Sequence, residues 1–271
     1  MKTKLIMQYQ QGLGNQMFQY ALHKSLENHG YDVKASLKLY SQSNQKFILP
    51  IVFKNIVLEE TEEECRYIFQ EPISSASYFL PNVFHIKNLD KCGVKGYWQS
   101  ELYFKDIKEK IKQDFIFNIP EEQLIKLGIK FQNDKKPTVG MHIRRGDYLQ
   151  YNEYQNICTD IYYERAIKYI KNKLGEDINF IVFSNDIKWC KEKYPNFTYI
   201  DTTLFNNYQD YYDMYLMSCC QHNIIANSSF SWWGAWLNSN ANKIIIAPNK
   251  WLNTQSTLDI WCPEWIKISG K

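Results

Sequence analysis

The sequence predicts an α/β fold whose C-terminal half is a Rossmann-like domain built on a parallel sheet. From residue 138 onward, short apolar runs alternate regularly with segments of helical periodicity. Such alternation is typical of βαβ units, because parallel strands must be joined by crossover connections that are usually helices. The expected strands are 138–143, 178–183, 197–201, 222–226 and 243–247, and the expected helices are about 159–173, 187–193, 209–219 and 229–238.

The N-terminal half begins with the same kind of pattern and then becomes irregular. An apolar run at 5–8 predicts a first strand, and a glycine turn leads into a helical pattern at about 15–28. Polar and acidic clusters over 40–95 predict short helices and loops. The other expected elements here are strands at 31–35 and 94–99 and a helix at about 102–115.

A polar, charged segment at 128–137 is the best candidate for a linker between two domains. The chain has 271 residues, which is long enough for two domains that each bury a core. We therefore expect one domain over 1–133 and a second over 134–271.

Composition argues against several classes of protein. The net charge of +3 is too small to indicate nucleic-acid binding, so no nucleic-acid partner is expected. No run of about 18 apolar residues is present, and no secretory signal is visible, so no transmembrane segment is expected. The 7 cysteines are odd in number and lack CxxC spacing, which favours reduced cytoplasmic thiols. The expected location is the cytoplasm, with peripheral association at the inner face of the membrane as an alternative.

A paired arginine lies directly after the predicted strand 138–143, where residues 142–148 read HIRRGDY. The carboxyl ends of strands in open α/β sheets are where ligands collect. Arginine suits a phosphate because its planar guanidinium donates two parallel hydrogen bonds and never loses its charge. The pair Arg144 and Arg145 therefore predicts an anion site. The alternative is a surface arginine pair that is bridged to Asp147.

Two further segments follow predicted strands. Residues 12–16 read GLGNQ, and Gly12 and Gly14 allow a tight turn and close approach of a ligand to the backbone. A dinucleotide fingerprint would need a third glycine where Met17 stands, so the alternative is an ordinary turn between a strand and a helix. Residues 227–236 read NSSFSWWGAW, and Ser228 and Ser229 at the helix start can hold a phosphate or simply cap the helix.

Other kinds of active site find no support in the sequence. There is no HExxH and no D-x-D, so no metal site is expected. A phosphate-binding GxxxxGK[ST] loop and the G-x-S-x-G elbow of hydrolases are also absent.

Taken together, the segments 12–21, 142–148 and 227–236 resemble the glycosyltransferase family 11 α-1,2-fucosyltransferases. The resemblance extends more distantly to α-1,6- and protein O-fucosyltransferases. It implies a GT-B-like pair of Rossmann-like domains, the N-terminal one on the acceptor side and the C-terminal one binding GDP-fucose. The implied reaction is inverting transfer of L-fucose from GDP-β-L-fucose to the 2-hydroxyl of a galactose-terminated oligosaccharide. No metal or other cofactor is implied.

The same resemblance implies roles for single residues on the donor side. Arg144 corresponds to the arginine that grips the β-phosphate of the donor, and Arg145 to one that braces the loop or binds a neighbouring phosphate. His142 and Asp186 correspond to positions that contact guanine or ribose, and a helix N-cap is the alternative for Asp186. The diphosphate would be held from its other side by Ser228 and Ser229.

The catalytic residues are the least determined part of this interpretation. The resemblance puts Asn15 near donor and acceptor, with Gly12 and Gly14 shaping its turn. We expect Arg144, Asn15 and Asp147 to take part in catalysis. The general base stays open among Asp147, Glu153 and Asp160, because all three lie within or after the arginine loop and the sequence does not distinguish them. The alternatives are that Asp147 only positions the arginines, and that a loose transition state needs proton removal only late and no dedicated base.

Two alternatives to this function remain at the level of the sequence. One is a fucosyltransferase of another linkage or acceptor, such as a protein O-fucosyltransferase. The other is a noncatalytic protein that binds a nucleotide or sugar. The acceptor is expected to be recognised by the irregular segment 40–95.

Overall fold

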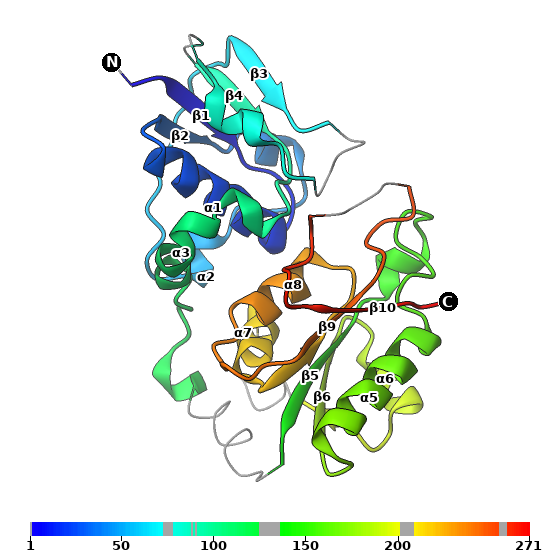
Figure 1. Ribbon diagram of the computed structural model, residues 1–271. Coiled ribbons are helices and arrows are strands. Elements are labelled where there is room, and N and C mark those ends of the chain that lie inside the picture. The colour runs from blue at the N-terminus through cyan, green and yellow to red at the C-terminus, as the bar shows by residue number, and fades with distance from the viewer. Residues whose placement is uncertain are drawn as a thin grey trace. The chain divides into compact units, whose positions relative to one another are not determined.

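The computed structural model describes residues 2–72, 78–87, 89, 91–124, 136–200, 209–254 and 259–271. The chain divides into two compact units, each with its own parallel sheet (Figure 1). Unit 1 comprises Met1–Asn118 and Gln255–Cys262, and unit 2 comprises Ile119–Thr254 and Pro263–Lys271. The predicted boundary at 133–134 lies outside the described residues. Nothing in the sequence pattern predicted that a segment near residue 260 belongs with the first unit.

Unit 1 is built on a parallel sheet of strand order β2-β1-β4-β3. The central strand β1 is buried at Leu5, Ile6 and Met7, as expected for a strand that is covered on both faces. In chain order its helices and strands are β1 (Lys4–Gln8), α1 (Leu13–Asn28), β2 (Asp32–Ser36), α2 (Leu49–Val52), β3 (Tyr67–Gln70), β4 (Cys92–Lys95) and α3 (Lys108–Asp114).

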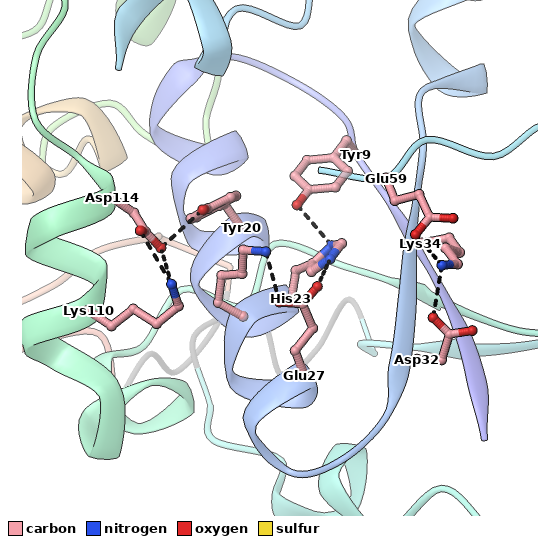
Figure 2. A network of polar contacts seen from close by, with 10 residues as sticks. Tyr9, Tyr20, His23, Glu27, Asp32, Lys34, Glu59, Lys110 and Asp114 are labelled. Atoms are coloured by element: carbon pink, nitrogen blue, oxygen red, sulfur yellow. Dashed lines mark hydrogen bonds and ion pairs between the residues drawn. The ribbon is translucent and has the colours of Figure 1, made fainter. Parts of the chain in front are cut away.

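Helix α1 buries polar as well as apolar side chains in unit 1. His23 is fully buried, and its ring nitrogens lie 3.2 Å from the Tyr9 hydroxyl and 3.2 Å from the Glu27 carboxylate. One helical turn earlier, the Tyr20 hydroxyl donates to the Asp114 carboxylate at 3.0 Å, which ties α1 to α3 (Figure 2). Buried polar groups are tolerated when they are hydrogen-bonded in this way. These contacts fix α1 against the sheet from which the turn at residues 9–12 emerges.

Unit 2 is built on a parallel sheet of strand order β10-β9-β8-β5-β6-β7. In chain order its helices and strands are β5 (Thr138–Ile143), α5 (Asp160–Leu174), β6 (Asn179–Ser184), α6 (Ile187–Lys193), β7 (Thr198–Tyr199), α7 (Tyr211–Cys219), β8 (His222–Ile224), α8 (Ser229–Trp236), β9 (Ile245–Pro248) and β10 (Ile266–Ile268).

The strand order of unit 2 is that of a doubly wound nucleotide-binding sheet. Numbered within the unit, the strands run 6-5-4-1-2-3, so the order reverses between β5 and β8. Helices α5 and α6 cover one face of the sheet and α7 and α8 cover the other (Figure 1). Connections leaving β5 and β8 therefore lead to helices on opposite faces, and in sheets of this kind ligands bind beyond the carboxyl ends of two such strands. This arrangement confirms the predicted Rossmann-like topology.

The core of unit 2 explains why β5 is its central strand. Every residue of β5 is buried, and its side chains pack with Tyr162 and Ile170 of α5 and with Ile246 of β9. Helix α8 is buried nearly all round, because apolar residues occupy all its faces. A Cβ atom at Gly234 would lie 3.0 Å from the Met217 Cβ, so this glycine permits the close approach of α7 and α8.

The structure differs from the sequence prediction at a few elements. The predicted helix 102–115 is two short 3-10 turns, Glu101–Tyr103 and Lys105–Ile107, followed by α3. The predicted strand 94–99 is wrong beyond Lys95, because Trp98 has φ +58° and the backbone N–H groups of residues 97 and 98 donate to the Glu71 carboxylate. The short strands β3 and β10 were not predicted; β3 is largely exposed although three of its four residues are apolar.

Candidate functional site

The predicted anion-binding segments of unit 2 meet at the point where the strand order reverses. Met141 of β5 pairs with Ile224 of β8, so both strands end side by side. β5 leads into the arginine pair and a 3-10 turn, Gly146–Leu149, and β8 leads through Asn227 and Ser228 into α8. The neighbouring strand β6 is in register with β5 up to the pair Ile143 and Ser184. Residues that are far apart in the sequence thus share one edge of the sheet.

Arg144 lies directly after the carboxyl end of β5 with about a third of its side chain exposed. Its Nη2 atom donates to the Asp147 carboxylate, at 2.9 Å from Oδ2 and 2.8 Å from Oδ1. The guanidinium carbon lies 5.2 Å from the centroid of the Tyr148 ring, within the range of a cation–π contact. The Nε atom is buried and has no hydrogen-bond partner among the described residues. Arg144 is therefore held in place and keeps an unused donor.

Arg145 has a different environment. Its guanidinium stacks on the Trp189 ring with its carbon 3.8 Å from the ring centroid, and Nε lies 3.1 Å from Oδ2 of Asp186. Its backbone N–H donates to Oδ1 of Asn185 at 2.9 Å. Gly146 follows with φ +59°, and a Cβ atom there would lie 2.7 Å from Asn185 Nδ2. Arg145 thus connects the turn after β5 to the turn after β6.

Asp186 is the N-cap of α6. Its Oδ1 atom accepts from the backbone N–H of Trp189 at 3.2 Å, and Oδ2 takes part in the ion pair with Arg145. Both carboxylate oxygens are therefore occupied by protein donors. This is the capping arrangement that was the alternative to a contact with guanine.

His142 is buried beneath the arginine pair, with 5% of its surface exposed. Burial, followed by the nearby Arg144 charge, lowers the pKa of His142 from 6.5 to about 3, so the ring is neutral at physiological pH. Its Nδ1 atom has no hydrogen-bond partner among the described residues, and its ring lies 5.9 Å from that of Phe230. A buried polar atom without a hydrogen-bond partner is uncommon in proteins.

The start of α8 follows the carboxyl end of β8, the strand beside β5. Ser228 is the N-cap residue with extended φ and ψ, yet its side chain makes no capping hydrogen bond. The first N–H groups of a helix have no partner within the helix, and its positive end favours an anion. Ser229 is the first residue of the helix. The Ser228 side chain is hydrogen-bonded to Tyr148 instead, so it does not cap these N–H groups.

Asn227, which sequence reasoning did not single out as a site residue, fixes the loop around this helix start. It is 3% exposed, its Nδ2 atom donates to the Trp251 carbonyl at 3.1 Å, and its Oδ1 accepts from the Cys158 thiol at 3.5 Å. Asn253 donates in turn to the carbonyls of Asn152 and Gln155, each at 2.8 Å. These amides anchor the loop that follows the arginine pair.

The three candidate bases differ in their contacts. Asp147 is about half exposed and bound to Arg144, and Asp160 in the first turn of α5 pairs with Lys193 at 2.6 Å. Glu153 is exposed in the loop between them, and its carbonyl accepts from Asn253. Asp147 lies nearest in sequence and contact to the arginines, where it orients Arg144.

In unit 1 the glycine turn lies at the carboxyl end of β1. The carbonyl of Gly12 accepts from the N–H groups of Asn15 and Gln16 at 3.0 and 3.1 Å as α1 begins. Gly12 has φ −73°, and no atom lies within 4 Å of a Cβ built on it, so the fold itself does not require glycine there. The Oδ1 atom of Asn15 accepts from Nε2 of Gln99 at 2.7 Å. Gly14 is buried inside the first turn of α1.

The predicted site residues thus fall into two groups, one in each unit. Unit 2 holds the arginine pair with its neighbours, and unit 1 holds the glycine turn. The first group is His142, Arg144, Arg145, Asp147, Asp186, Ser228 and Ser229, and the second is Gly12, Gly14 and Asn15. Across the described ranges, no three His, Cys, Asp or Glu side chains are grouped so that they could hold a metal ion. Among the helices that the structure describes, none combines the length and apolar character needed to cross a membrane.

Sequence comparison matches residues 2–269 to the family model described as Glycosyl transferase family 11. An α-1,2-colitosyltransferase of Escherichia coli is 36% identical over 95% of this chain and 96% of its own length. The O-antigen biosynthesis glycosyltransferase WbnK of Escherichia coli is 30% identical, with 95% and 98% covered. Human galactoside α-(1,2)-fucosyltransferase 1 is 26% identical, with 65% of this chain and 52% of its own covered.

Two solved structures share the fold. NodZ α-1,6-fucosyltransferase, soaked with GDP-fucose, aligns with a TM-score of 0.54 at 12% identity, covering 88% of this chain and 93% of its own. A mutant FUT1 of Arabidopsis thaliana in complex with GDP aligns with a TM-score of 0.52 at 11% identity, covering 94% and 72%. These matches confirm the predicted GT-B-like α/β fold.

Proposed function

The chain belongs to glycosyl transferase family 11, and on that premise we propose that it transfers L-fucose from GDP-β-L-fucose to the 2-hydroxyl of a galactoside. The transfer inverts the anomeric centre and needs no metal. Family membership favours glycosyl transfer over the noncatalytic alternative. The relatives named galactoside α-(1,2)-fucosyltransferase 1 support this linkage over that of a protein O-fucosyltransferase.

The observation that carries the proposal is the convergence of Arg144 and the α8 start at the reversal point of the unit 2 sheet. When the bond between fucose and GDP breaks, negative charge develops on the β-phosphate. Arg144 brings a permanent positive charge on a partly exposed guanidinium to this edge, and α8 brings the positive end of a helix. Preorganised donors of this kind stabilise the leaving group without reorganisation during the reaction.

The other unit 2 residues support this proposal in more specific ways. We assign Arg145 to bracing the loop that carries Arg144, because its guanidinium is bound by Asp186 and Trp189. Asp147 orients Arg144 through their ion pair. The neutral His142 offers Nδ1 to a hydroxyl or ring nitrogen of the donor's guanosine.

We further propose that unit 1 acts on the acceptor side. The turn at Gly12 and Gly14 brings Asn15 to the carboxyl edge of its own sheet, where the backbone of Gly12 is open to close approach. In this proposal Asn15 contacts the reacting sugars. The acceptor hydroxyl loses its proton late, as a loose transition state allows.

The central test is substitution of Arg144. Arg144→Ala should lower kcat for fucose transfer to a galactoside by about 10²–10³-fold, the usual effect of removing one preorganised donor. Arg144→Lys should recover only part of the rate, because an ammonium lacks the planar fork. Lys168→Ala, an exposed charge on α5, is the matched control and should behave as wild type. Wild-type turnover by a folded Arg144→Ala variant would refute the proposal.

Metal independence is tested in the same assay by adding EDTA. We expect turnover of the dialysed protein to be unchanged by the chelator, because arginine and helix donors supply the charge stabilisation. A loss of activity that is restored by Mg²⁺ or Mn²⁺ would contradict this part of the proposal.

GDP-colitose is a second donor to test in the same assay, because the 36% identical relative is named an α-1,2-colitosyltransferase. Colitose is fucose without its 3-hydroxyl, so one enzyme framework can serve either sugar. The two donors are compared by kcat/KM for GDP-fucose and GDP-colitose with the same galactoside. A clear preference for GDP-fucose supports the proposed donor, whereas a clear preference for GDP-colitose replaces it while keeping the α-1,2 linkage.

A further inference from the structure

In unit 1, a side chain outside the recognised motifs determines which way the Asn15 amide faces. The Nε2 atom of Gln99 donates to Oδ1 of Asn15 at 2.7 Å, across 84 residues of sequence. Asn15 makes no side-chain hydrogen bond through Nδ2 to any described residue, and it is only partly buried. An amide whose oxygen is already bound presents its two N–H groups to whatever binds next to it. Asn15 is thereby set as a donor.

Gln99 is in turn held by an unusual piece of backbone. Trp98, directly before it, has φ +58°, a left-handed conformation that is rare for a bulky residue. The buried Glu71 carboxylate holds this conformation, because it accepts from the N–H of Tyr97 at 2.6 Å and from the N–H of Trp98 at 3.2 Å. The Trp98 ring is fully buried and meets the Tyr103 ring edge-on at 5.5 Å.

The residue after Gln99 is fixed as well. Ser100 is fully buried, its N–H donates to the Trp98 carbonyl at 2.8 Å, and its hydroxyl accepts from the Leu102 N–H at 3.2 Å. The same strand end is tied to α1, since Nε2 of Gln19 donates to the Gly96 carbonyl at 3.0 Å. Oε1 of Gln19 accepts from the Gln10 N–H at 3.0 Å, which joins the glycine turn to this segment. A strained backbone that the surroundings hold this firmly is typical of functional sites.

We propose that Gln99 is a positioning residue that orients the Asn15 amide as a hydrogen-bond donor toward an oxygen of the reacting sugars. This inference rests on the proposed function, in which Asn15 contacts those sugars. The oxygen is a hydroxyl, ring or bridging oxygen of the donor or acceptor, because an outward N–H group can bind only an acceptor atom. It also follows that the Asn15 side chain presents its N–H groups, rather than its oxygen, to the sugars, since the oxygen faces Gln99.

The first experiment changes the direction of the hydrogen bond without removing it. Gln99→Glu has nearly the same shape, but an ionised carboxylate accepts only, so Asn15 must turn its N–H groups inward to meet it. Gln99→Leu removes the bond altogether. We expect both variants of the full chain to lose at least tenfold in kcat for fucose transfer. Gln70→Leu, an exposed glutamine of β3, is the control and should retain wild-type rates.

A double-mutant cycle separates positioning from a general structural effect. In the Asn15→Ala background, Gln99→Leu and Gln99→Glu should change kcat by less than twofold, because no amide remains to be oriented. The inference is overturned if either Gln99 variant keeps more than half of the wild-type kcat. It is equally overturned if the fold loss in kcat of the double variant equals the product of the losses in the two single variants.

A spectroscopic measurement tests the geometry independently of turnover. In ¹⁵N-labelled protein, the side-chain NH₂ signals of Asn15 are identified by their loss in Asn15→Asp. They should shift downfield in Gln99→Glu, where the group becomes bonded to a carboxylate, but not in Gln70→Leu. If these signals do not respond, the inference is wrong even in an active enzyme. If they respond while the wild-type protein transfers no sugar, the proposed function fails and the orientation of Asn15 stands.

Discussion

At the scale of single residues, two neighbouring arginines have separate tasks. Arg144 keeps a third of its surface exposed and a free Nε donor, whereas Arg145 is stacked on Trp189 and bound to Asp186. The sequence indicates that a charged pair follows a strand. It cannot assign the two tasks, because the partners of Arg145 lie about 40 residues further along the chain.

Gly146 and Gly12 both lie in predicted site motifs, but the fold requires glycine only at Gly146. Gly146→Ala should destabilise the protein by about 1–2 kcal/mol, because Gly146 has φ +59° and its new Cβ would meet Asn185 Nδ2 at 2.7 Å. Gly12→Ala should cost less than about 1 kcal/mol, since Gly12 has φ −73° and open space around it. Urea unfolding measures both. Gly12→Ala should nevertheless lower kcat/KM, and unchanged kinetics would mean that no ligand approaches this backbone.

His142 should make stability depend on pH. Its pKa is about 3 in the folded protein and 6.5 when unperturbed, so the unfolded chain binds the extra proton between these values. The free energy of unfolding therefore falls as the pH drops below 6.5, by up to about 1.4 kcal/mol per pH unit for this group. Between pH 7.5 and 5.0 the wild type should lose about 2 kcal/mol more than His142→Gln in urea unfolding. Equal losses in the two proteins would show that His142 is not buried as a neutral ring.

At the scale of elements, the alternation of strands and helices in unit 2 was predictable because each element repeats its own hydrophobic period. The confirmed elements include β5, α5, β6, α6, α7 and α8, with bounds within a few residues. β10 was missed because three residues are too short for a periodic signal, and β4 was extended too far because the effect of Glu71 on the backbone is nonlocal. A contact between residues far apart in the chain, such as that of Glu71 with the backbone of Trp98, does not alter the hydrophobic period of the sequence.

Helix α6 offers a test of the role of Asp186. Asp186→Ala should lower the free energy of unfolding by about 1 kcal/mol through loss of the N-cap, whereas Asp186→Ser should retain most of it. Affinity for GDP and for IDP, which lacks the 2-amino group, is measured in parallel. If Asp186 only caps α6 and binds Arg145, the ratio of the two affinities stays the same in Asp186→Ser. A lost preference for GDP with unchanged stability would favour the guanine contact that the resemblance implies.

At the scale of the whole molecule, the unit that binds the donor can be identified by the segments that GDP protects from hydrogen exchange. Hydrogen exchange with and without GDP should show slower exchange in the unit 2 segments 143–149, 184–187 and 226–231, where the strand ends and the α8 start gather. UDP at the same concentration is the control for a nonspecific diphosphate effect, and Arg144→Ala should reduce the protection. Protection confined to residues 9–16 of unit 1 would contradict the assignment of the donor to unit 2.

The sequence located the motifs that follow strands, but it gave no sign that the segment 255–262 groups with the first unit. The motif residues were predictable because each follows a strand, and strand ends are where sites form. Gln99 and Asn227 were not singled out as site residues, since their importance comes from contacts across 84 and 24 residues. No pattern in the sequence near residue 260 indicates that the chain returns there to pack with unit 1 either.

That return has a consequence for how the protein is made. The chain leaves unit 1 after Asn118 and comes back at 255–262, where Asp259 accepts from the Phe79 N–H at 2.8 Å. It then re-enters unit 2, where β10 pairs with β9 and the Gly270 carbonyl accepts from Thr159 at 2.6 Å. On a ribosome, therefore, the first unit lacks its last segment while only its own first 118 residues have emerged. The last segment of each unit lies within residues 255–271, so we expect the final packing of both units to follow the synthesis of this one stretch.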